Sequence, residues 1–296
     1  MSYWVAGPWS KRKYTILQKY VKACETFWDK YRNFVYVETH GGSGKVVLRD
    51  TGEISDGSPM IAAQITPSFP CHIIEIDPKR FATLQSSLSA FKRVEVINGD
   101  CNTSIDQVLT KIYSWRFSFF FVDPDGYVYY DSKGNKYDQL KWETVNKIAS
   151  HHKSEILLNF PLEPIYRPGG YVLNRPDDHK SISMGDNFER FFGDAEWKKI
   201  GINARKLLDH YMETRLRKFY DYIGALLIRG GDNNLPLYYL VYCSKKDLGG
   251  TIMRNVMSTE WIDILGGVYP LTRDNYSTKR DWLDAEFPLK YFVFEN

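Results

Sequence analysis

Five short apolar runs recur along the first half of the chain. They are FVYVE (34–38), HIIEID (72–77), VEVING (94–99), FSFFFVD (117–123) and EILLNF (155–160). Each run is rich in β-branched or aromatic residues and is apolar over almost its whole length. Strands that are buried on both faces of a sheet have this composition, whereas half-exposed strands alternate polar and apolar positions. The runs therefore predict five central strands of one sheet.

Four segments with helical character lie between these runs, at residues 56–65, 77–91, 104–113 and 140–151. In the first segment, Ser58 is the expected N-cap and Pro59 the expected first helical residue. The Asp77-Pro78 pair opens the second segment in the same manner. Strands that alternate with helices predict an α/β fold, with a Rossmann-like, doubly wound and mostly parallel sheet.

The remaining segments depart from this alternation. Residues 11–33 place apolar side chains at roughly helical spacing and predict an amphipathic helix before the first strand. Residues 162–221 form an insertion that we expect to be a loop through RPGGYVLNRPDDHK (167–180) and helical afterwards. Residues 225–243 predict an antiparallel hairpin that closes the sheet edge, followed by a helix at about 247–257.

The composition excludes few classes of protein. With 43% hydrophobic and 25% charged residues the chain is ordinary for a globular protein, and its net charge of +3 neither identifies nor excludes a nucleic-acid binder. The four cysteines are scattered and form no zinc-binding spacing, so we expect no metal site and a reducing compartment. Without a signal core or a run of about 20 apolar residues, we expect a soluble, cytoplasmic protein with no membrane association.

One segment is conspicuously basic. Residues 198–218, KKIGINARKLLDHYMETRLRK, contain seven Lys and Arg residues against two acids. This stretch could follow a phosphate backbone, with Trp197, Tyr211 and Tyr220 as stacking surfaces. Alternatively, it is a solvated face whose rings turn inward. We favour the second interpretation, because aromatic residues are frequent throughout the chain.

The first apolar run enters a glycine-rich turn, ETHGGSGK (38–45). An ATP-binding P-loop needs GxxxxGK followed by Ser or Thr, but here Thr39 stands in place of the first glycine and Val46 follows the lysine. A dinucleotide-binding GxGxxG fails as well, since Val47 occupies the third glycine position. The pattern disfavours an ATPase, while the glycines still allow a ligand to approach the backbone closely.

Acidic residues stand at the ends of the next three runs. Glu75 lies near the end of the second run, where we expect the strand to end, Asp100 follows the third run and Asp123 ends the fourth. In nucleoside-binding α/β sheets, an acid after the second strand accepts hydrogen bonds from ribose hydroxyls. The carboxyl ends of parallel strands meet at one rim, so these acids and the glycine turn should share a site. Each acid could instead simply cap a turn, and for Asp77 a helix cap is the favoured role.

Taken together, these stretches resemble class I S-adenosylmethionine-dependent methyltransferases, through ETHGGSGK, IIEIDP (73–78), NGD (98–100), VDPDG (122–126) and the terminal hairpin. More narrowly, residues 11–260 resemble the three-Cys-motif partner family, through DGSPMIA (56–62), LLNFP (157–161) and LYYLVYCSK (237–245). The family's usual Ala-Gly-Pro-Gly turn is replaced here, and Asp125 stands where an aromatic residue is common. The resemblance implies S-adenosyl-L-methionine as cofactor and a separate cysteine-motif partner protein.

The order of the segments predicts a single domain with an insertion, and the resemblance implies the site residues within it. One domain would span 1–296, as a leading helix (11–33), a cofactor-binding core (34–161), an insertion and substrate region (162–221), a closing hairpin and helix (222–260) and a tail (261–296). The cofactor would contact Glu38, His40, Gly41, Gly42, Gly44, Glu75 and Asp100.

At the reacting centre, the resemblance implies that Asp123 and the Pro124 carbonyl hold an exocyclic amine toward the methyl group. Tyr127 would stack on a base, Asn159 would border the substrate mouth, and Arg167 would meet a phosphate. The expected function is methyl transfer to a nucleic-acid base or nucleotide amine. The alternative is a methyltransferase-like binding module that transfers nothing and works with the partner protein.

Overall fold

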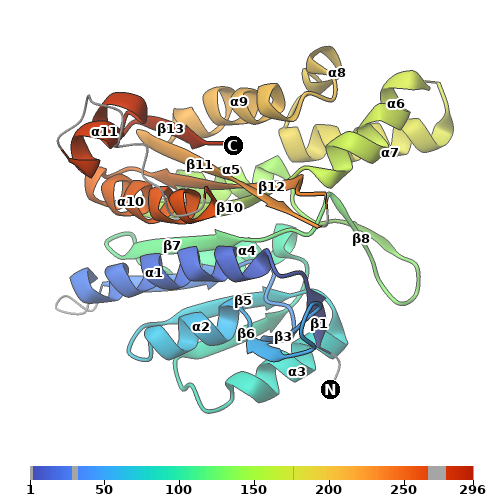
Figure 1. Ribbon diagram of the computed structural model, residues 1–296. Helices are drawn as coiled ribbons and strands as arrows, with labels where there is room; N and C mark the ends of the chain where they lie inside the picture. The colour runs from blue at the N-terminus through green and yellow to red at the C-terminus, as the bar shows by residue number, and fades with distance from the viewer. Residues whose placement is uncertain (1–2, 29–32, 176, 232, 266–277, 296) are drawn as a thin grey trace.

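A central sheet of eight strands organises the chain (Figure 1). The computed structural model describes residues 3–28, 33–175, 177–231, 233–265 and 278–295. In sheet order the strands are β13 (Tyr291–Phe294), β11 (Tyr222–Gly230), β12 (Leu235–Ser244), β10 (Ser154–Pro161), β7 (Phe117–Val122), β2 (Phe34–Glu38), β5 (Cys71–Glu75) and β6 (Val94–Asn98). Only β12 runs antiparallel to its neighbours within this sheet. The predicted mostly parallel sheet is confirmed.

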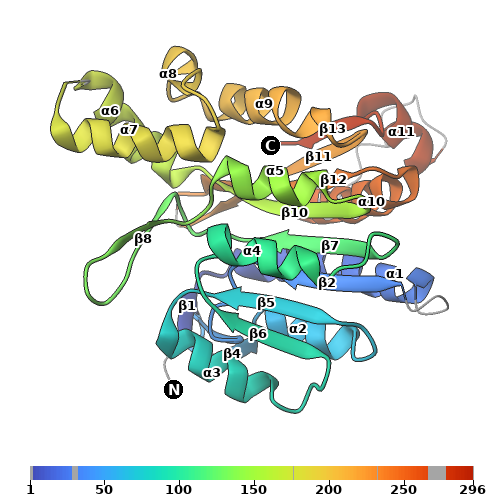
Figure 2. The ribbon, with the colours of Figure 1, turned by 180° about the vertical axis from the view of Figure 1, so that it is seen from behind.

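The strand order places a crevice at the centre of the sheet. Read from β6 to β10, the five predicted strands follow the doubly wound order, which reverses between β2 and β7. In open α/β sheets, ligands bind outside the carboxyl ends of the strands at this reversal point. Those ends lie on the side where the hairpin of β8 (Val128–Tyr130) and β9 (Lys136–Asp138) projects from the molecule (Figures 1 and 2).

Helices cover both faces of the sheet. On one face lie α1 (Ser10–Trp28), α2 (Ser58–Ile65) and α10 (Asp247–Ile264); on the other lie α4 (Cys101–Thr110) and α5 (Trp142–Ser150) (Figures 1 and 2). Along β7, Phe119 and Phe121 pack toward α1, while Phe120 and Val122 pack toward α4 and α5. This double burial explains the continuous apolar runs. The expectation that a strand is buried on both faces is wrong for β6, which is half-exposed because it forms the sheet edge.

The starts of the helices differ in part from the expected ones. Gly57, not Ser58, is the N-cap of α2, and Pro59 is therefore its second residue. Asp77 does cap α3 (Pro78–Leu88), since its side chain accepts hydrogen bonds from the N–H groups of Lys79 and Arg80. Helix α4 begins three residues before the expected position 104, because Asp100 caps it.

The insertion is helical nearly throughout. It contains a π-turn (Ile165–Gly169), α6 (Gly170–Asn174), α7 (His179–Phe192), α8 (Trp197–Ile200), α9 (Ala204–Thr214) and a 3₁₀ turn (Leu216–Lys218). The expected loop at 167–180 is therefore wrong at 167–174 and again at 179–180, where α7 begins. The basic stretch 198–218 is also interrupted, because Gly201 adopts a φ of 76° between α8 and α9.

Several strands were not expected. A small sheet joins β1 (Trp4–Ala6), β3 (Lys45–Leu48) and β4 (Ile54–Asp56), so the glycine turn leads into a strand. The hairpin of β11 and β12 does not close the central sheet, because β13 adds a further strand beside β11. The tail also contains α11 (Lys279–Glu286), and α10 extends seven residues past the expected end at 257. Residues 29–32 of the expected leading helix lie outside the described residues.

Candidate functional site

A hollow of about 510 Å³ lies at the carboxyl ends of the parallel strands. Its lining combines the glycine turn after β2, the ends of β5 and β7, the start of α4 and the β8–β9 hairpin. Helix α1 closes it through Ser10, Lys13 and Tyr14. The expected site residues that line it are His40, Gly41, Gly42, Gly44, Glu75, Asp100 and Asp123.

The three glycines of the turn have different physical roles. A Cβ on Gly41 would lie 2.5 Å from Ile73 Cγ2 and 2.8 Å from Leu84 Cδ2, so this position is required by packing. Gly42 adopts a φ of 62°, and a Cβ there would meet nothing within 4 Å. Gly44 also has a positive φ, of 78°. The open space beside Gly42 is where a ligand can approach the backbone.

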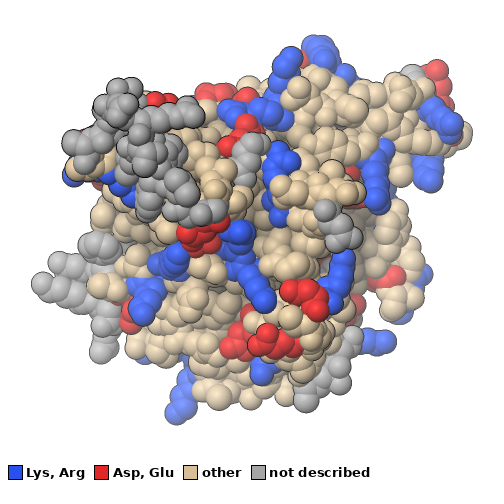
Figure 3. Space-filling view, in the orientation of Figure 1, with Lys and Arg blue, Asp and Glu red and all other residues tan. Residues whose placement is uncertain are grey.

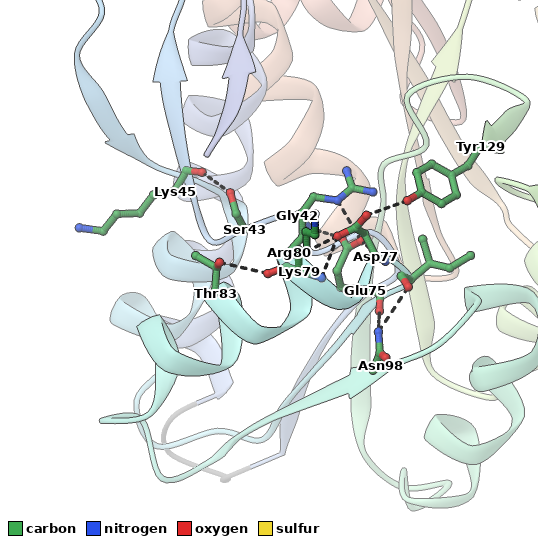
Figure 4. A network of polar contacts seen from close by, with 11 residues as sticks. Gly42, Ser43, Lys45, Glu75, Asp77, Lys79, Arg80, Thr83, Asn98 and Tyr129 are labelled. Atoms are coloured by element: carbon green, nitrogen blue, oxygen red, sulfur yellow. Dashed lines mark hydrogen bonds and ion pairs between the residues drawn. The ribbon is translucent and has the colours of Figure 1, made fainter. Parts of the chain in front are cut away.

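Glu75 is held at the end of β5 by the chain's own donors (Figure 4). Its Oε2 accepts a hydrogen bond of 2.7 Å from the N–H of Gly42, and its Oε1 accepts one of 2.8 Å from the N–H of Asp77. The guanidinium of Arg80 lies 3.2 Å from Oε1. Burial nevertheless raises the pKa of Glu75, against these stabilising contacts. The acid thus fixes the glycine turn as well as facing the hollow.

Asp100 and Asp77 both serve as helix caps. Asp100 Oδ1 accepts hydrogen bonds of 2.9 Å from the backbone N–H and the side-chain amide of Asn102. Asp77 Oδ1 caps α3, while its Oδ2 accepts a hydrogen bond of 2.9 Å from the hydroxyl of Tyr129 on β8. Figure 4 shows this last contact reaching across from the hairpin. Of the two acids, only Asp100 lines the hollow.

Asp123 is engaged by two partners from distant elements. The Nζ of Lys13 on α1 lies 2.5 Å from its Oδ2, and the two side chains are 8% and 10% exposed. The amide of Asn159 on β10 donates a 2.8 Å hydrogen bond to its Oδ1. Burial alone would lower the pKa of Lys13, but the carboxylate of Asp123 raises it well above its ordinary value. Lys13 therefore stays protonated and paired.

Asn159 also joins the two acceptors that were expected to hold a substrate amine. The same Nδ2 donates a 3.1 Å hydrogen bond to the carbonyl oxygen of Pro124. One amide NH₂ thus bridges the Asp123 carboxylate and the Pro124 carbonyl. Asn159 is 5% exposed, and its Oδ1 is buried without a hydrogen-bond partner among the described residues. It lies behind Asp123 and is not among the described residues that line the hollow.

Glu38 is fully buried below the hollow and does not line it. Its Oε1 accepts a 2.5 Å hydrogen bond from Ser58 Oγ, and its Oε2 accepts one of 2.8 Å from the hydroxyl of Tyr36. Burial raises its pKa to about 8, although both hydrogen bonds act in the opposite direction. Any influence of Glu38 on a ligand would therefore pass through Ser58, which does line the hollow.

His40 is a fixed, neutral part of the wall. Its Nε2 lies 3.0 Å from the carbonyl oxygen of Gln139, so this nitrogen carries the proton, and Nδ1 accepts a 2.7 Å hydrogen bond from Thr39 Oγ1. Burial lowers its pKa, against the opposing effect of the bond to Gln139. Because both ring nitrogens are used, His40 supplies shape rather than a base.

Two of the expected substrate residues, Tyr127 and Arg167, are not among the described residues that line this hollow. Tyr127 is 4% exposed, and its ring is stacked on Phe191 at 4.2 Å and edge-on to Phe188 at 4.9 Å. A ring so enclosed has no free face for a base, so the stacking role does not fit. The side chain of Arg167 is 83% exposed and pairs with Glu163 at 3.4 Å, outside the described lining of the hollow.

Several lining residues were not expected from the sequence. They include Lys13 and Tyr14 on α1, Arg80 on α3, Asp125 after β7 and Tyr129 on β8. For Tyr129 a sequence signal existed, since VYY (128–130) and KYD (136–138) flank a Ser-Lys-Gly-Asn turn typical of a hairpin. For Lys13 no sequence signal existed, because a lysine on an amphipathic helix normally faces solvent.

The charges around the hollow are predominantly negative. Its lining contains two cations and five carboxylates: Lys13, Arg80, Glu75, Asp100, Asp123, Asp125 and Asp138. Ion pairs join Asp123 to Lys13, Glu75 to Arg80 and Asp138 to Arg190. This excess of carboxylates favours a cationic ligand over a polyphosphate. Figure 4 also shows Lys45, the lysine of the GGSGK turn, extending away from the Glu75 cluster.

The basic stretch 198–218 is largely neutralised within the chain. Lys198 pairs with Glu189 at 2.6 Å, Lys199 with Glu196 at 2.7 Å, and Arg205 with Asp209 at 3.0 Å and Glu295 at 2.8 Å. The rings of Trp197, Tyr211 and Tyr220 are at most 1% exposed. Figure 3 shows the Lys and Arg side chains over the insertion dispersed among other residues on this face. The inward rings of the favoured interpretation are confirmed, and these three rings offer no stacking surface.

Two kinds of feature are absent from the described residues. In these parts of the chain, no group of three or more His, Cys, Asp or Glu side chains is arranged to hold a metal ion. None of the described helices has the length and apolarity that crossing a membrane requires.

Comparison with known proteins reveals similarity of fold. No family model matches the chain, and no curated protein matches its sequence. A crystal structure from Legionella pneumophila, assigned to family model DUF519, shares 12% identity over 84% of this chain and 92% of its own, with a TM-score of 0.51. An S-adenosylmethionine-dependent methyltransferase from Agrobacterium tumefaciens shares 12% identity over 81% of this chain and 63% of its own, with a TM-score of 0.43. The M. jannaschii protein TYW2 in complex with AdoMet shares 11% over 71% of this chain and 67% of its own, with a TM-score of 0.33. At these identities the similarity concerns the Rossmann-like fold alone.

Proposed function

We propose that the chain binds S-adenosyl-L-methionine in the hollow at the end of the sheet and transfers its methyl group to an amine. A nucleic-acid base or nucleotide amine is the proposed acceptor. One observation carries the proposal: a glycine turn and the strand-end acids Glu75, Asp100 and Asp123 line a single hollow at the reversal point of a doubly wound sheet. The methyltransferases among the solved structures of similar fold support it.

The residues that line the hollow fit this cofactor better than a nucleoside triphosphate. The hollow, at about 510 Å³, is within the range of about 300–1,000 Å³ that is usual for small-molecule sites. A sulfonium cation would be attracted by the excess of carboxylates over cations in the lining, whereas a polyphosphate would be repelled. After Gly44 the chain enters β3, so no helix N-terminus follows the turn to bind phosphate.

Individual contacts follow from the positions of the groups. The backbone beside Gly42 offers the open surface against which the cofactor would lie. Each carboxylate oxygen has two lone pairs, and Glu75 Oε2 is known to use one, on Gly42. The second would accept a ribose hydroxyl. Asp100 would accept a hydrogen bond from the adenine amino group through Oδ2, the oxygen that does not cap α4.

Asp123 and Pro124 would orient the acceptor. The bound cofactor supplies an activated methyl group on sulfur, so the protein need mainly align the amine and receive its proton. The bridging amide of Asn159 demonstrates that one NH₂ group can be shared by the Asp123 carboxylate and the Pro124 carbonyl. A substrate amine would have to use their remaining lone pairs on the side of the hollow.

A second candidate function follows from the same contacts. Both oxygens of Asp123 already accept bonds from the chain, and the Pro124 carbonyl accepts one from Asn159. Such an arrangement favours a methyltransferase-like binding module that transfers no methyl group and works with a cysteine-motif partner protein. Membership of the three-Cys-motif partner family belongs to this hypothesis and rests on the resemblance of the sequence motifs alone.

Calorimetry and a transfer assay test the proposal. We expect S-adenosylmethionine and S-adenosylhomocysteine to bind the purified protein and ATP not to bind. Glu75→Ala should weaken adenosyl binding by about 1.5–3 kcal/mol, the usual value for hydrogen bonds to a charged group. Glu53→Ala, at an exposed acid on the β3–β4 turn, serves as the matched control and should bind normally. Tight ATP binding without adenosyl binding would overturn the cofactor assignment, and absence of labelled-methyl transfer would favour the binding module.

A further inference from the structure

A second hollow, of about 440 Å³, lies between the β8–β9 hairpin and the helical insertion. It shares four lining residues with the first hollow: Asp125, Val128, Tyr130 and Gln139. The two hollows therefore meet along the segment that follows β7. The hairpin is tied to α7 at this place, because Lys136 Nζ donates a 2.8 Å hydrogen bond to Ser183 Oγ.

We propose that this second hollow is the acceptor site and that Asp125, rather than Asp123, is the carboxylate that receives the acceptor amine. The proposal rests on the proposed methyltransferase function and deepens it, and it moves the acceptor role given above to Asp123 and Pro124 to Asp125. Asp125 lies in the wall common to both hollows, which is where an acceptor amine and a methyl donor must meet. Asp123 lines the first hollow but is not among the described residues that line the second.

The contacts of the two acids differ in the way that this assignment requires. Both oxygens of Asp123 are occupied, by Lys13 and Asn159, and its side chain is 10% exposed. Asp125 is exposed, and no described residue donates a hydrogen bond to its carboxylate or forms an ion pair with it. Its backbone is nevertheless fixed, because its N–H donates a 2.8 Å hydrogen bond to Gln139 Oε1. Asp125 is thus a positioned carboxylate with free acceptor capacity.

The walls of the second hollow indicate the chemical class of the acceptor. Met184 and Pro168 are half-buried apolar members of the lining, Phe188 and Pro164 are buried ones, and Tyr130 is 62% exposed. Such walls suit a planar ring. Lys136 and Lys180 are exposed members of the lining and suit a phosphate. We therefore assign the acceptor as a nucleobase with an exocyclic amine, carried by a free nucleotide or by a polynucleotide strand.

The transfer step balances with these groups alone. The acceptor nitrogen uses its lone pair to form the new N–C bond as the C–S bond of the donor breaks, and that electron pair remains on sulfur. The nitrogen loses one proton, which passes to the Asp125 carboxylate and then to solvent. Asp123, with Lys13 and Asn159, holds the segment in place and takes no proton.

The test compares paired variants with labelled S-adenosylmethionine as methyl donor. The probes are total cellular RNA, sheared genomic DNA, and AMP, CMP and GMP, with dTMP as a nucleotide that lacks an exocyclic amine. Asp125→Asn should reduce transfer about 100-fold or more, as expected for loss of a positioned proton acceptor. Its affinity for S-adenosylhomocysteine and its thermal unfolding should remain those of the wild type. Met184→Trp should block the second hollow, whereas Ile182→Trp, on an exposed position of α7, should not affect transfer.

The outcomes separate this inference from the function on which it rests. If the wild type binds no adenosyl ligand, the proposed function fails and the inference fails with it. If the wild type transfers methyl groups and Asp125→Asn is equally active, or Met184→Trp behaves like Ile182→Trp, the acceptor site is wrong and the function stands. Adenosyl binding without transfer to any probe would overturn the nucleobase assignment. Transfer to mononucleotides, or only to RNA or DNA, identifies the carrier of the base.

Discussion

The buried pair of Lys13 and Asp123 permits a quantitative test of how the hollow is built. The two charged atoms lie 2.5 Å apart, and the side chains are 8% and 10% exposed. Removing one partner of a fully buried pair costs about 3–5 kcal/mol, because the other charge is left without compensation. One side of the Lys13–Asp123 pair faces a hollow that water can enter, and in a Lys13 variant Asn159 would keep its hydrogen bond to Asp123. We therefore expect Lys13→Met to lower the free energy of unfolding by about 2–3 kcal/mol.

A double-mutant cycle isolates the interaction itself. Urea unfolding of the wild type, Lys13→Met, Asp123→Asn and the double variant should give a coupling energy of about 2 kcal/mol. The control pair is Lys147 and Asp106, whose charged atoms lie 2.6 Å apart but whose side chains are 41% and 59% exposed. Its coupling should be about 0–1 kcal/mol, since solvent screens it.

Salt provides a second criterion for the same pair. Raising the ionic strength from about 0.05 to 0.5 M should weaken the coupling of the exposed control pair and leave that of Lys13 and Asp123 nearly unchanged. Coincident unfolding curves from tryptophan fluorescence and ellipticity are needed for the free energies to be valid. A coupling no larger than that of the control pair, with the same salt dependence, would refute the view that α1 closes the hollow through a buried ion pair.

Two further predictions concern the glycine turn and the acid beneath it. Gly41→Ala should lower stability by about 1–3 kcal/mol through overpacking against Ile73 and Leu84. Gly42→Ala should cost about 1–2 kcal/mol of backbone strain, which thermal unfolding measures. It should also reduce adenosyl affinity, which calorimetry measures, because its methyl group would enter the open space proposed for the ligand. Unchanged affinity in Gly42→Ala would contradict the ligand placement. Burial raises the pKa of Glu38 from 4.5 to about 8. Between these pH values the unfolded chain has released a proton that the folded protein retains. The wild type therefore loses stability as the pH rises through this window, with no further loss above pH 8. Glu38→Gln cannot titrate, so its stability relative to the wild type should increase from pH 5 to pH 8 in urea unfolding; parallel pH profiles would show that Glu38 is ionised in the folded protein.

The sheet could be predicted because its strands carry their own signal. A strand buried on both faces must be apolar at successive positions, and the runs at 34–38 and 117–123 match β2 and β7 almost to the residue. The Asp77 cap was also predictable, since capping depends on neighbours only three residues away. The hairpin of β3 and β4 was missed despite a usable signal, namely KVVL followed by an Asp-Thr-Gly turn.

The contacts of the site could not be predicted in the same way. Asp123 and Asp125 are two positions apart, yet the carboxylate of Asp123 is paired on both oxygens and the carboxylate of Asp125 has no partner among the described residues. The difference depends on Lys13, which lies 110 residues away in sequence. Ser58 likewise looked like a cap, but a tertiary hydrogen bond to Glu38 decides its role. Interactions between distant segments leave no local pattern in a single sequence.

The position of α1 constrains the order in which the molecule can be assembled. Helix α1 is translated before the sheet, yet Tyr20 bonds to Tyr242 on β12, Lys13 lies 5.7 Å from the ring of Tyr238, and Lys19 pairs with Glu260 on α10. These partners leave the ribosome more than 200 residues later. A nascent chain that stalls before β12 can pack α1 against β2 and β7 but lacks its contacts with β12 and α10, so the wall of the hollow that α1 supplies is completed only late in synthesis.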